Sequence, residues 1–100
     1  GITGVSPVPS GEPLKFALEQ NYPNPFNPST EIAFTIPKAS QVELNVYNVL
    51  GQQVATLVNG PMAAGSHAVT FNAANLASGV YFYRLQAGSL ATTQKMLLMK

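Results

Sequence analysis

The stretch GVYFYRLQA, residues Gly79–Ala87, decides the fold class. Aromatic and branched residues dominate it, and such residues are enriched in strands. Its side chains fall into two alternating sets, which are Tyr81, Tyr83 and Leu85 on one face and Val80, Phe82 and Arg84 on the other. Successive side chains of a β-strand point to opposite faces of the sheet, so this alternation predicts a strand.

The segments around this strand repeat the pattern. Thr30–Ile36 and Val42–Asn48 each place three apolar residues on one face, and the turn residues Pro37–Ser40 separate them. Further strand signals occupy Lys15–Gln20, Gln52–Val58, Ser66–Asn72 and Leu90–Met99, and Asn59-Gly60-Pro61 is expected to end the second of these. About seven short strands with turn signals about every 8–12 residues are typical of a two-sheet β-sandwich. We therefore predict an all-β sandwich.

Composition limits the classes of function. Hydrophobic residues make up 46% of the 100 residues and charged residues only 9%, which argues against disorder. The net charge of +1 comes from dispersed positions that form no basic stripe, so we expect no nucleic-acid partner. No apolar run reaches the length of a membrane-spanning helix, so no membrane span is expected. Residues 1–15 are rich in Pro, Gly and Ser and predict an interdomain linker, with any export leader upstream on a longer chain.

The inventory of reactive side chains argues against an enzyme. The chain has no Cys, no Asp and a single histidine, His67, with no glutamate near it in sequence. A glycoside hydrolase needs two carboxylates that face each other across a cleft. Glu31 and Glu43 could be cross-strand neighbours, but both fall on predicted solvent faces. We expect no catalytic site, no metal site and no cofactor.

The segment NYPNPFNPST, Asn21–Thr30, is unusual for a strand-rich chain. Its three prolines remove backbone donors, so it cannot lie inside a sheet. One interpretation is a rigid lid in which Tyr22 and Phe26 plug one end of the sandwich. The alternative is a loop that recognises a partner.

Two further features stand out near the end of the chain. Tyr81 has the position of a corner tyrosine, whose hydroxyl bonds back to the backbone, and Arg84 is expected to be exposed. In KMLLMK, Lys95–Lys100, alternation breaks, because four consecutive apolar residues present groups to both faces. Either this strand is covered on both sides within the fold, or a partner covers one of them. Charged residues at the ends of an apolar strand, here Lys95 and Lys100, oppose its aggregation.

Five sequence blocks, in order, resemble the type A C-terminal sorting domains of the type IX (Por) secretion system. They are Leu18–Thr30 (LEQNYPNPFNPST), Val46–Val54 (VYNVLGQQV), Ala64–Phe71 (AGSHAVTF), Ser78–Arg84 (SGVYFYR) and Lys95–Lys100 (KMLLMK). The resemblance covers residues 16–100 and implies an immunoglobulin-like sandwich of about seven antiparallel strands. It also implies a source among the Bacteroidota and their relatives.

The resemblance further implies a function without chemistry. Such a domain directs an upstream cargo on the same chain from the periplasm through the outer-membrane translocon, to the cell surface or the medium. A sortase-like protease then removes it, here by a cut within Gly1–Lys15. The residues that would carry recognition are Gly79, Tyr81, Arg84, Lys95, Met96, Leu97, Leu98, Met99 and Lys100.

Two alternatives from other classes remain open at this point. A carbohydrate-binding module would need a row of exposed aromatic side chains, for which Tyr47 and Phe82 are the outward candidates. A structural spacer of a multidomain secreted enzyme would need no recognition surface.

Overall fold

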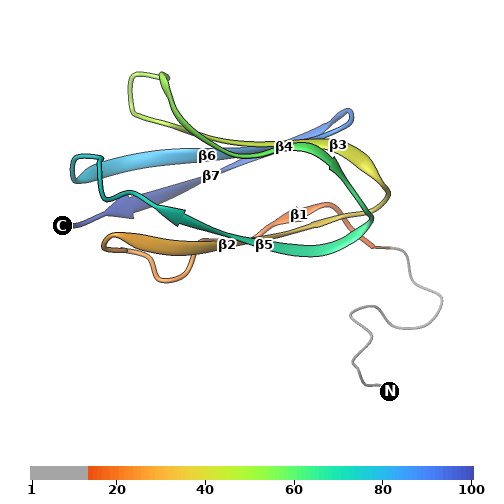
Figure 1. Ribbon diagram of the computed structural model, residues 1–100, viewed down its shortest axis with the longest axis horizontal. Coiled ribbons are helices and arrows are strands. Elements are labelled where there is room, and N and C mark those ends of the chain that lie inside the picture. Colours follow the sequence, from red (N-terminus) through yellow and green to blue (C-terminus); the bar gives the residue numbers. More distant parts are fainter. Residues whose placement is uncertain (1–13) are drawn as a thin grey trace, which may run out of the picture.

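The computed structural model describes residues 14–100 and places seven strands in two sheets that pack face to face (Figure 1). One sheet has the order β1-β2-β5 and the other the order β4-β3-β6-β7, and every neighbouring pair is antiparallel. The strands are β1 Ala17–Leu18, β2 Ser29–Ile36, β3 Ser40–Tyr47, β4 Gln53–Met62, β5 Gly65–Asn72, β6 Gly79–Ala87 and β7 Leu90–Leu98. The all-β, immunoglobulin-like sandwich expected from the sequence is confirmed.

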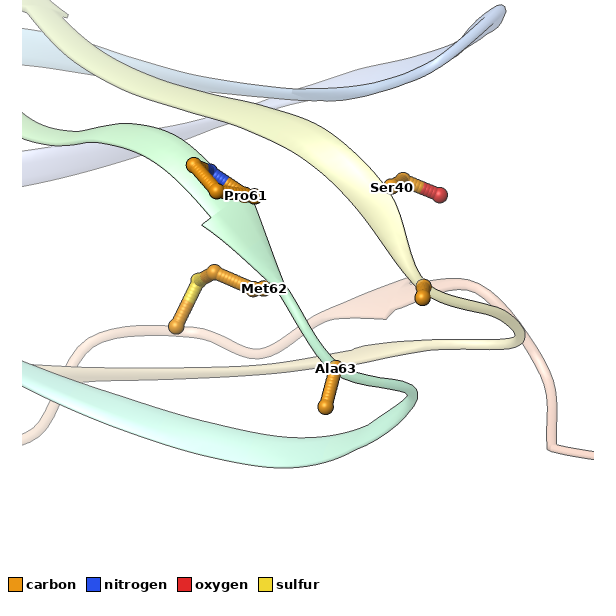
Figure 2. Close-up of a pocket in the computed structure, with 5 residues that line it drawn as sticks. Ser40, Pro61, Met62 and Ala63 are labelled. Carbon is orange, nitrogen blue, oxygen red and sulfur yellow. The ribbon is translucent and has the colours of Figure 1, made fainter.

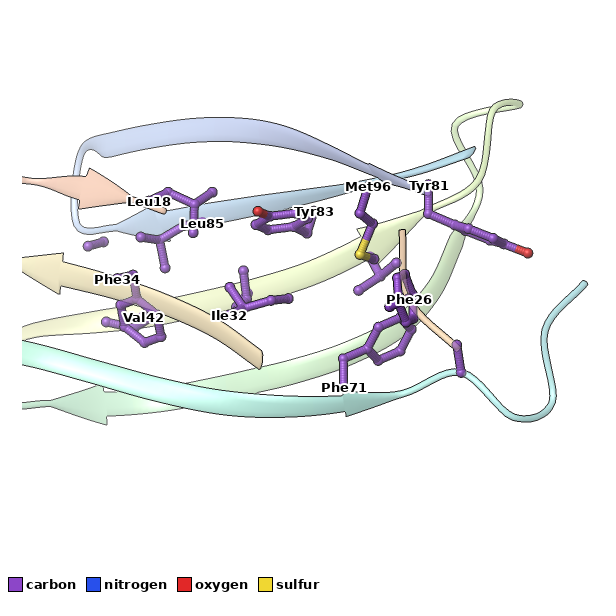
Figure 3. Close-up of a cluster of buried hydrophobic side chains, with 14 of the residues drawn as sticks. Leu18, Phe26, Ile32, Phe34, Val42, Phe71, Tyr81, Tyr83, Leu85 and Met96 are labelled. Atoms are coloured by element: carbon purple, nitrogen blue, oxygen red, sulfur yellow. The ribbon is translucent and has the colours of Figure 1, made fainter. Parts of the chain in front are cut away.

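Alternation along β2, β3 and β6 builds the core between the two sheets (Figure 3). Each of these strands turns three or more apolar side chains inward and leaves the intervening ones on an outer face. Burying each large apolar side chain contributes about 1.5–3 kcal/mol. The largest fully buried side chains are Tyr83, Phe34, Ile32, Ile36, Leu44, Leu85, Met96, Leu98, Val42 and Val46.

The chain crosses repeatedly between the sheets, at the β2–β3, β4–β5 and β5–β6 connections. This topology separates Glu31 from Glu43, which the sequence allowed as cross-strand neighbours. Glu31 lies opposite Thr70 in the three-stranded sheet, whereas Glu43 lies opposite Asn59 in the four-stranded sheet. That expectation was wrong, because β2 and β3 are consecutive in the chain but belong to different layers.

Strand β4 is longer than the sequence predicts. It continues through Asn59-Gly60-Pro61, which was expected to break it, and Pro61 is the register partner of Gln41. Because β4 is an edge strand with a neighbour on one side only, a proline without a backbone donor is tolerated there. Two register shifts opposite β3 mark β-bulges in the same strand.

Between Leu14 and Lys100 no helix is long and apolar enough to cross a membrane. The predicted linker, residues 1–15, lies almost wholly outside the described residues, so the proposed cleavage segment has no structural account here.

Candidate recognition surface

Strand β7 forms one edge of the four-stranded sheet and carries the KMLLMK segment. Its alternation persists in the fold, since Met96 and Leu98 are 1% and 0% exposed in the core. Leu97 points to the outer face and is half-buried, and Met99 is 56% exposed. This end of the strand is therefore covered on its inner face at Met96 and Leu98 and only in part on its outer face.

The edge of β7 that no strand pairs with is contacted near Leu97 by residues 21–28, which we call the proline strap. The Phe26 amide donates to the Leu97 carbonyl at 3.0 Å, and the Met99 amide donates to the Phe26 carbonyl at 3.0 Å, which forms a parallel bridge. The side-chain oxygen of Asn24 accepts from the Leu97 amide at 3.0 Å. Three polar backbone groups at this edge are thus satisfied by the domain's own chain.

The side chain of Phe26 anchors the strap in the core. It is 2% exposed, and its ring lies 6.1 Å from that of Phe71, centroid to centroid (Figure 3). Tyr22, by contrast, is 81% exposed. The prediction that both aromatic residues plug the end of the sandwich is confirmed for Phe26 and wrong for Tyr22. Tyr22 instead uses its backbone, which pairs with that of Glu31.

Tyr83 of β6 connects the start of the proline strap to the four-stranded sheet. Its hydroxyl donates to the Glu19 carbonyl at 2.7 Å and accepts from the Asn21 amide at 2.8 Å. Burial of this phenol raises the pKa of Tyr83 to about 12, so the folded state favours its protonated form. The sequence placed Tyr83 in the core but held no signal for these bonds, because their partners lie 64 and 62 residues away.

A small polar network fixes the start of the strap. The Asn21 side chain, 2% exposed, donates to Thr30 Oγ1 at 3.0 Å and to the Pro23 carbonyl at 3.1 Å. The Thr30 hydroxyl donates to the same carbonyl at 2.9 Å. Buried polar groups that are mutually satisfied in this way hold one conformation rather than several.

Two glutamines also join the β1 segment to β7. Gln94 donates to the Leu18 carbonyl at 2.9 Å, and Gln20 donates to the Lys95 carbonyl at 2.7 Å. Together with the strap, these bonds close one long side of the sandwich.

The glycine–tyrosine block lies beside the closing strand. Gly79 and Tyr81 of β6 are the register partners of Leu98 and Met96 of β7. Gly79 has a φ of +150°, a backbone conformation that residues other than glycine rarely adopt. The structure therefore brings two of the predicted recognition segments, Ser78–Arg84 and Lys95–Lys100, into one continuous pair of strands.

Individual side chains in these segments have different positions. Tyr81 is 7% exposed and donates to the Ala77 carbonyl at 2.7 Å, which confirms the corner-tyrosine prediction. Arg84 is exposed, as expected, and donates to Gln86 at 3.1 Å. Lys95 is exposed on the outer face, while the Lys100 ammonium donates to the Ala74 carbonyl. Tyr81, Met96 and Leu98 thus lie in the core, and the other predicted recognition residues are accessible in whole or part.

The outer face of the four-stranded sheet carries an apolar cluster that the sequence analysis identified only in part. Tyr47 and Phe82 are cross-strand partners and half-buried, and both face outward as predicted. Val80 and Leu97 form the next outward pair along β6 and β7. The neighbouring β3–β4 hairpin lies at the same end of the molecule as the C-terminus (Figure 1) and exposes Val49 and Leu50.

Depressions elsewhere on the described part of the chain offer little for chemistry. One of them has a volume of about 490 Å³ and is lined by Ala39, Ser40, Pro61, Met62 and Ala63, none of which titrates (Figure 2). His67 does not contribute a free imidazole, since one ring nitrogen lies 2.8 Å from the Ala63 carbonyl oxygen and the ring packs beside Phe34. Residues 14–100 hold no group of three His, Cys, Asp or Glu side chains suited to a metal ion.

The chain matches a known family over most of its length. The sequence model of the family described as "Secretion system C-terminal sorting domain" matches residues 20–99. This match confirms the resemblance drawn from the five sequence blocks. Neither a curated protein nor a solved structure matches the chain.

Proposed function

Because the chain belongs to the secretion system C-terminal sorting domain family, we propose that it carries an upstream cargo on the same chain through the outer membrane by type IX secretion. The family is one of sorting signals and not of enzymes. The domain would act by being recognised as a folded sandwich. Its route would run through the periplasm to the cell surface or the medium.

The family match supports the proposal most directly, and the pairing of β6 with β7 adds a physical reason. The two blocks to which the resemblance assigns recognition are adjacent strands in continuous register from Gly79 to Ala87. A receptor can therefore contact both blocks at once on a single rigid surface. Rigid surfaces bind at a lower entropic cost than segments that must first be ordered.

Recognition by addition of a receptor strand to the edge of β7 has less support. The edge from Leu97 to Met99 is already paired with the proline strap. A receptor strand would have to replace these hydrogen bonds and extract the buried Phe26 side chain. The outer face of the same strands is accessible without such a rearrangement.

Sortase-like processing within residues 1–15, and transfer of the cargo to the surface, belong to the proposal through the family resemblance alone. Their test is mass spectrometry of the released cargo, which should end within the linker.

The export function is tested by fusing residues 1–100 to a periplasmic reporter in a host with type IX secretion. We expect the reporter on the surface or in the medium. The same reporter without the domain should stay in the periplasm. Retention of the complete fusion in the periplasm, with the domain shown to be folded, would contradict the proposal.

A variant sharpens this test. Leu98 is fully buried, so Leu98→Ser is expected to unfold the domain, whereas Leu97 is half-buried and faces outward. Leu97→Ser therefore separates loss of recognition from loss of fold, and circular dichroism with thermal melting verifies that the fold is retained.

A further inference from the structure

An apolar patch lies at one end of the outer face of the four-stranded sheet. Its members come from β3, the β3–β4 hairpin, β6 and β7, and we call them the outer apolar patch: Tyr47, Val49, Leu50, Val80, Phe82 and Leu97. Directly opposed residues on neighbouring strands have Cβ atoms about 4.5–5.5 Å apart, so the Tyr47–Phe82 and Val80–Leu97 pairs form two contiguous rows.

The hairpin beside these rows is rigid and displays its apolar side chains. Asn48 Oδ1 accepts from the amides of Leu50 at 2.9 Å and Gln52 at 3.0 Å. The Asn48 amide donates to the Gln52 carbonyl at 3.0 Å, and the Gly51 amide donates back to the Asn48 carbonyl at 3.0 Å. Gly51 has a φ of +82°, which this tight turn requires and which glycine adopts without strain.

The result of this turn is that Val49 and Leu50 are 66% and 79% exposed. Large apolar side chains held outward in one conformation are a frequent mark of an interaction site, since nothing in the turn itself needs them to be apolar.

The charged side chains on the same face change sign with distance from the outer apolar patch. Lys95 is the register partner of Phe82, and Arg84 follows Phe82 at the next outward position of β6. The carboxylate of this face, Glu43, pairs with Gln86, one outward position farther from the patch. The border of the outer apolar patch is therefore cationic, and the negative charge lies farther away.

We propose that the outer apolar patch is the docking surface for a folded protein of the export machinery whose contact surface is apolar and bordered by carboxylates. This inference rests on the proposed function. Electrostatic complementarity with Lys95 and Arg84 would orient the complex and raise the association rate, while the apolar contact would supply most of the affinity.

A receptor has two candidate binding places, the edge of β7 and the outer apolar patch, and the structure favours the patch. The edge of β7 at Leu97–Met99 is satisfied by the proline strap, whereas Val49 and Leu50 have no cover among the described residues. A lipid surface fits less well, because stable adsorption needs a larger basic cluster than the two cations that border the patch.

The first experiment compares two exposed leucines in the reporter fusion. Leu50→Ser removes a patch residue, and Leu90→Ser is the matched control in the β6–β7 hairpin at the opposite end of the sheet (Figure 1). We expect the export rate to fall roughly tenfold for Leu50→Ser, as for a central contact residue, and to stay unchanged for Leu90→Ser. Equal export of both variants, with the unaltered fusion exported, overturns the docking surface and leaves the sorting function intact.

A second experiment tests the cationic border. Lys95→Glu is expected to slow export, with a loss that grows as the salt concentration falls. Lys38→Glu, an exposed lysine in the β2–β3 connection at the far end of the sandwich, makes the same charge change and should have no effect. If the two variants are exported at equal rates at every salt concentration, the proposal that carboxylates border the partner's contact surface is overturned.

The third experiment identifies the occupant. A photo-crosslinking residue replaces Leu50 in exporting cells, with one in place of Leu90 as the control. An adduct with an envelope protein that forms only from position 50 and disappears in the Lys95→Glu background supports the proposal. Adducts with a second copy of the chain, co-sedimentation of the purified domain with anionic phosphatidylglycerol vesicles, or glycan binding that Leu50→Ser abolishes would each overturn it.

Discussion

The two edges of the four-stranded sheet are guarded against foreign strands in different ways. At β7 the chain covers the C-terminal end of its own edge, with the proline strap bonded to the backbone of Leu97 and Met99. At β4 no strand of residues 14–100 covers the edge, but two bulges and Pro61 interrupt its regular ladder. Natural sheet proteins use both devices against edge-to-edge association. The comparison teaches that β4 and the end of β7 that carries the KMLLMK segment are both poor sites for strand pairing, which supports the proposal that the outer face is recognised.

The largest expected effect concerns the anchor of the strap. Phe26→Ala should lower the free energy of unfolding by about 3–5 kcal/mol, because it leaves a cavity beside Phe71 and releases the strap from β7. Urea denaturation measures the change. Tyr22→Ala, which removes an exposed aromatic residue from the same segment, should shift stability by no more than about 0.5 kcal/mol. Similar losses for the two variants would show that the strap does not depend on its buried ring.

The next effect concerns the hydroxyl that ties the strap to β6. Tyr83→Phe should cost about 1–3 kcal/mol, because the Asn21 amide and the Glu19 carbonyl lose their partner in a buried place. Tyr81→Phe removes one bond, to Ala77, and should cost less. Thermal melting of both variants gives the order, and a larger loss for Tyr81→Phe would contradict this assignment.

Tyr83 also predicts a dependence of stability on pH. Its pKa is raised from 10.0 to about 12 in the folded state, mainly by desolvation, so folding favours the protonated phenol. The resulting stability is fully present below pH 10 and is lost as the pH rises from about 10 to about 12. Urea midpoints across this window should fall less steeply for Tyr83→Phe than for the unaltered domain. Parallel pH profiles would exclude Tyr83 as their source.

A smaller effect is expected at the side chain that caps the β7 edge. Asn24→Ala should destabilise the domain by about 0.5–1.5 kcal/mol, since the Leu97 amide loses its acceptor. Hydrogen exchange at that amide should accelerate as well. Asn27→Ala, an exposed position in the same segment, is the control and should change neither quantity.

The smallest change in stability is expected at β4. Pro61→Thr should alter the free energy of unfolding by no more than about 0.5 kcal/mol, yet it restores a backbone donor to an uncovered edge. Light scattering at high concentration should then show more self-association than for the unaltered domain. A variant that stays monomeric would indicate that the bulges alone protect β4.

Local patterns predicted the layers of this fold well. The alternation in Thr30–Ile36, Val42–Asn48 and Gly79–Ala87 identified β2, β3 and β6 and the face that each buries. Such patterns show which side chains must be shielded from water, and burial of their apolar surface drives the two sheets to pack together. The corner position of Tyr81 could also be predicted, because its acceptor lies only four residues away.

Non-local pairings could not be predicted in the same way. Nothing in the composition of the proline strap indicates that Asn24 bonds to an amide 73 residues later. For the same reason KMLLMK could be interpreted as a strand hidden on both faces or as one offered to a partner. The structure shows an intermediate arrangement, with Met96 and Leu98 buried and Leu97 half-covered. The recognition residues themselves stay predictions.

The bridge between Phe26 and the last strand has a consequence for the timing of folding. Contacts between distant parts of a chain form late, because a long loop must close before they stabilise anything. Residues near position 26 leave the ribosome well before Leu97 and Met99 do, so the backbone of Phe26 has no strand to pair with until synthesis of the domain is almost complete. A copy that ended before β7 would lack the acceptor and donor groups of Leu97 and Met99, and its proline strap would have no edge to bond to.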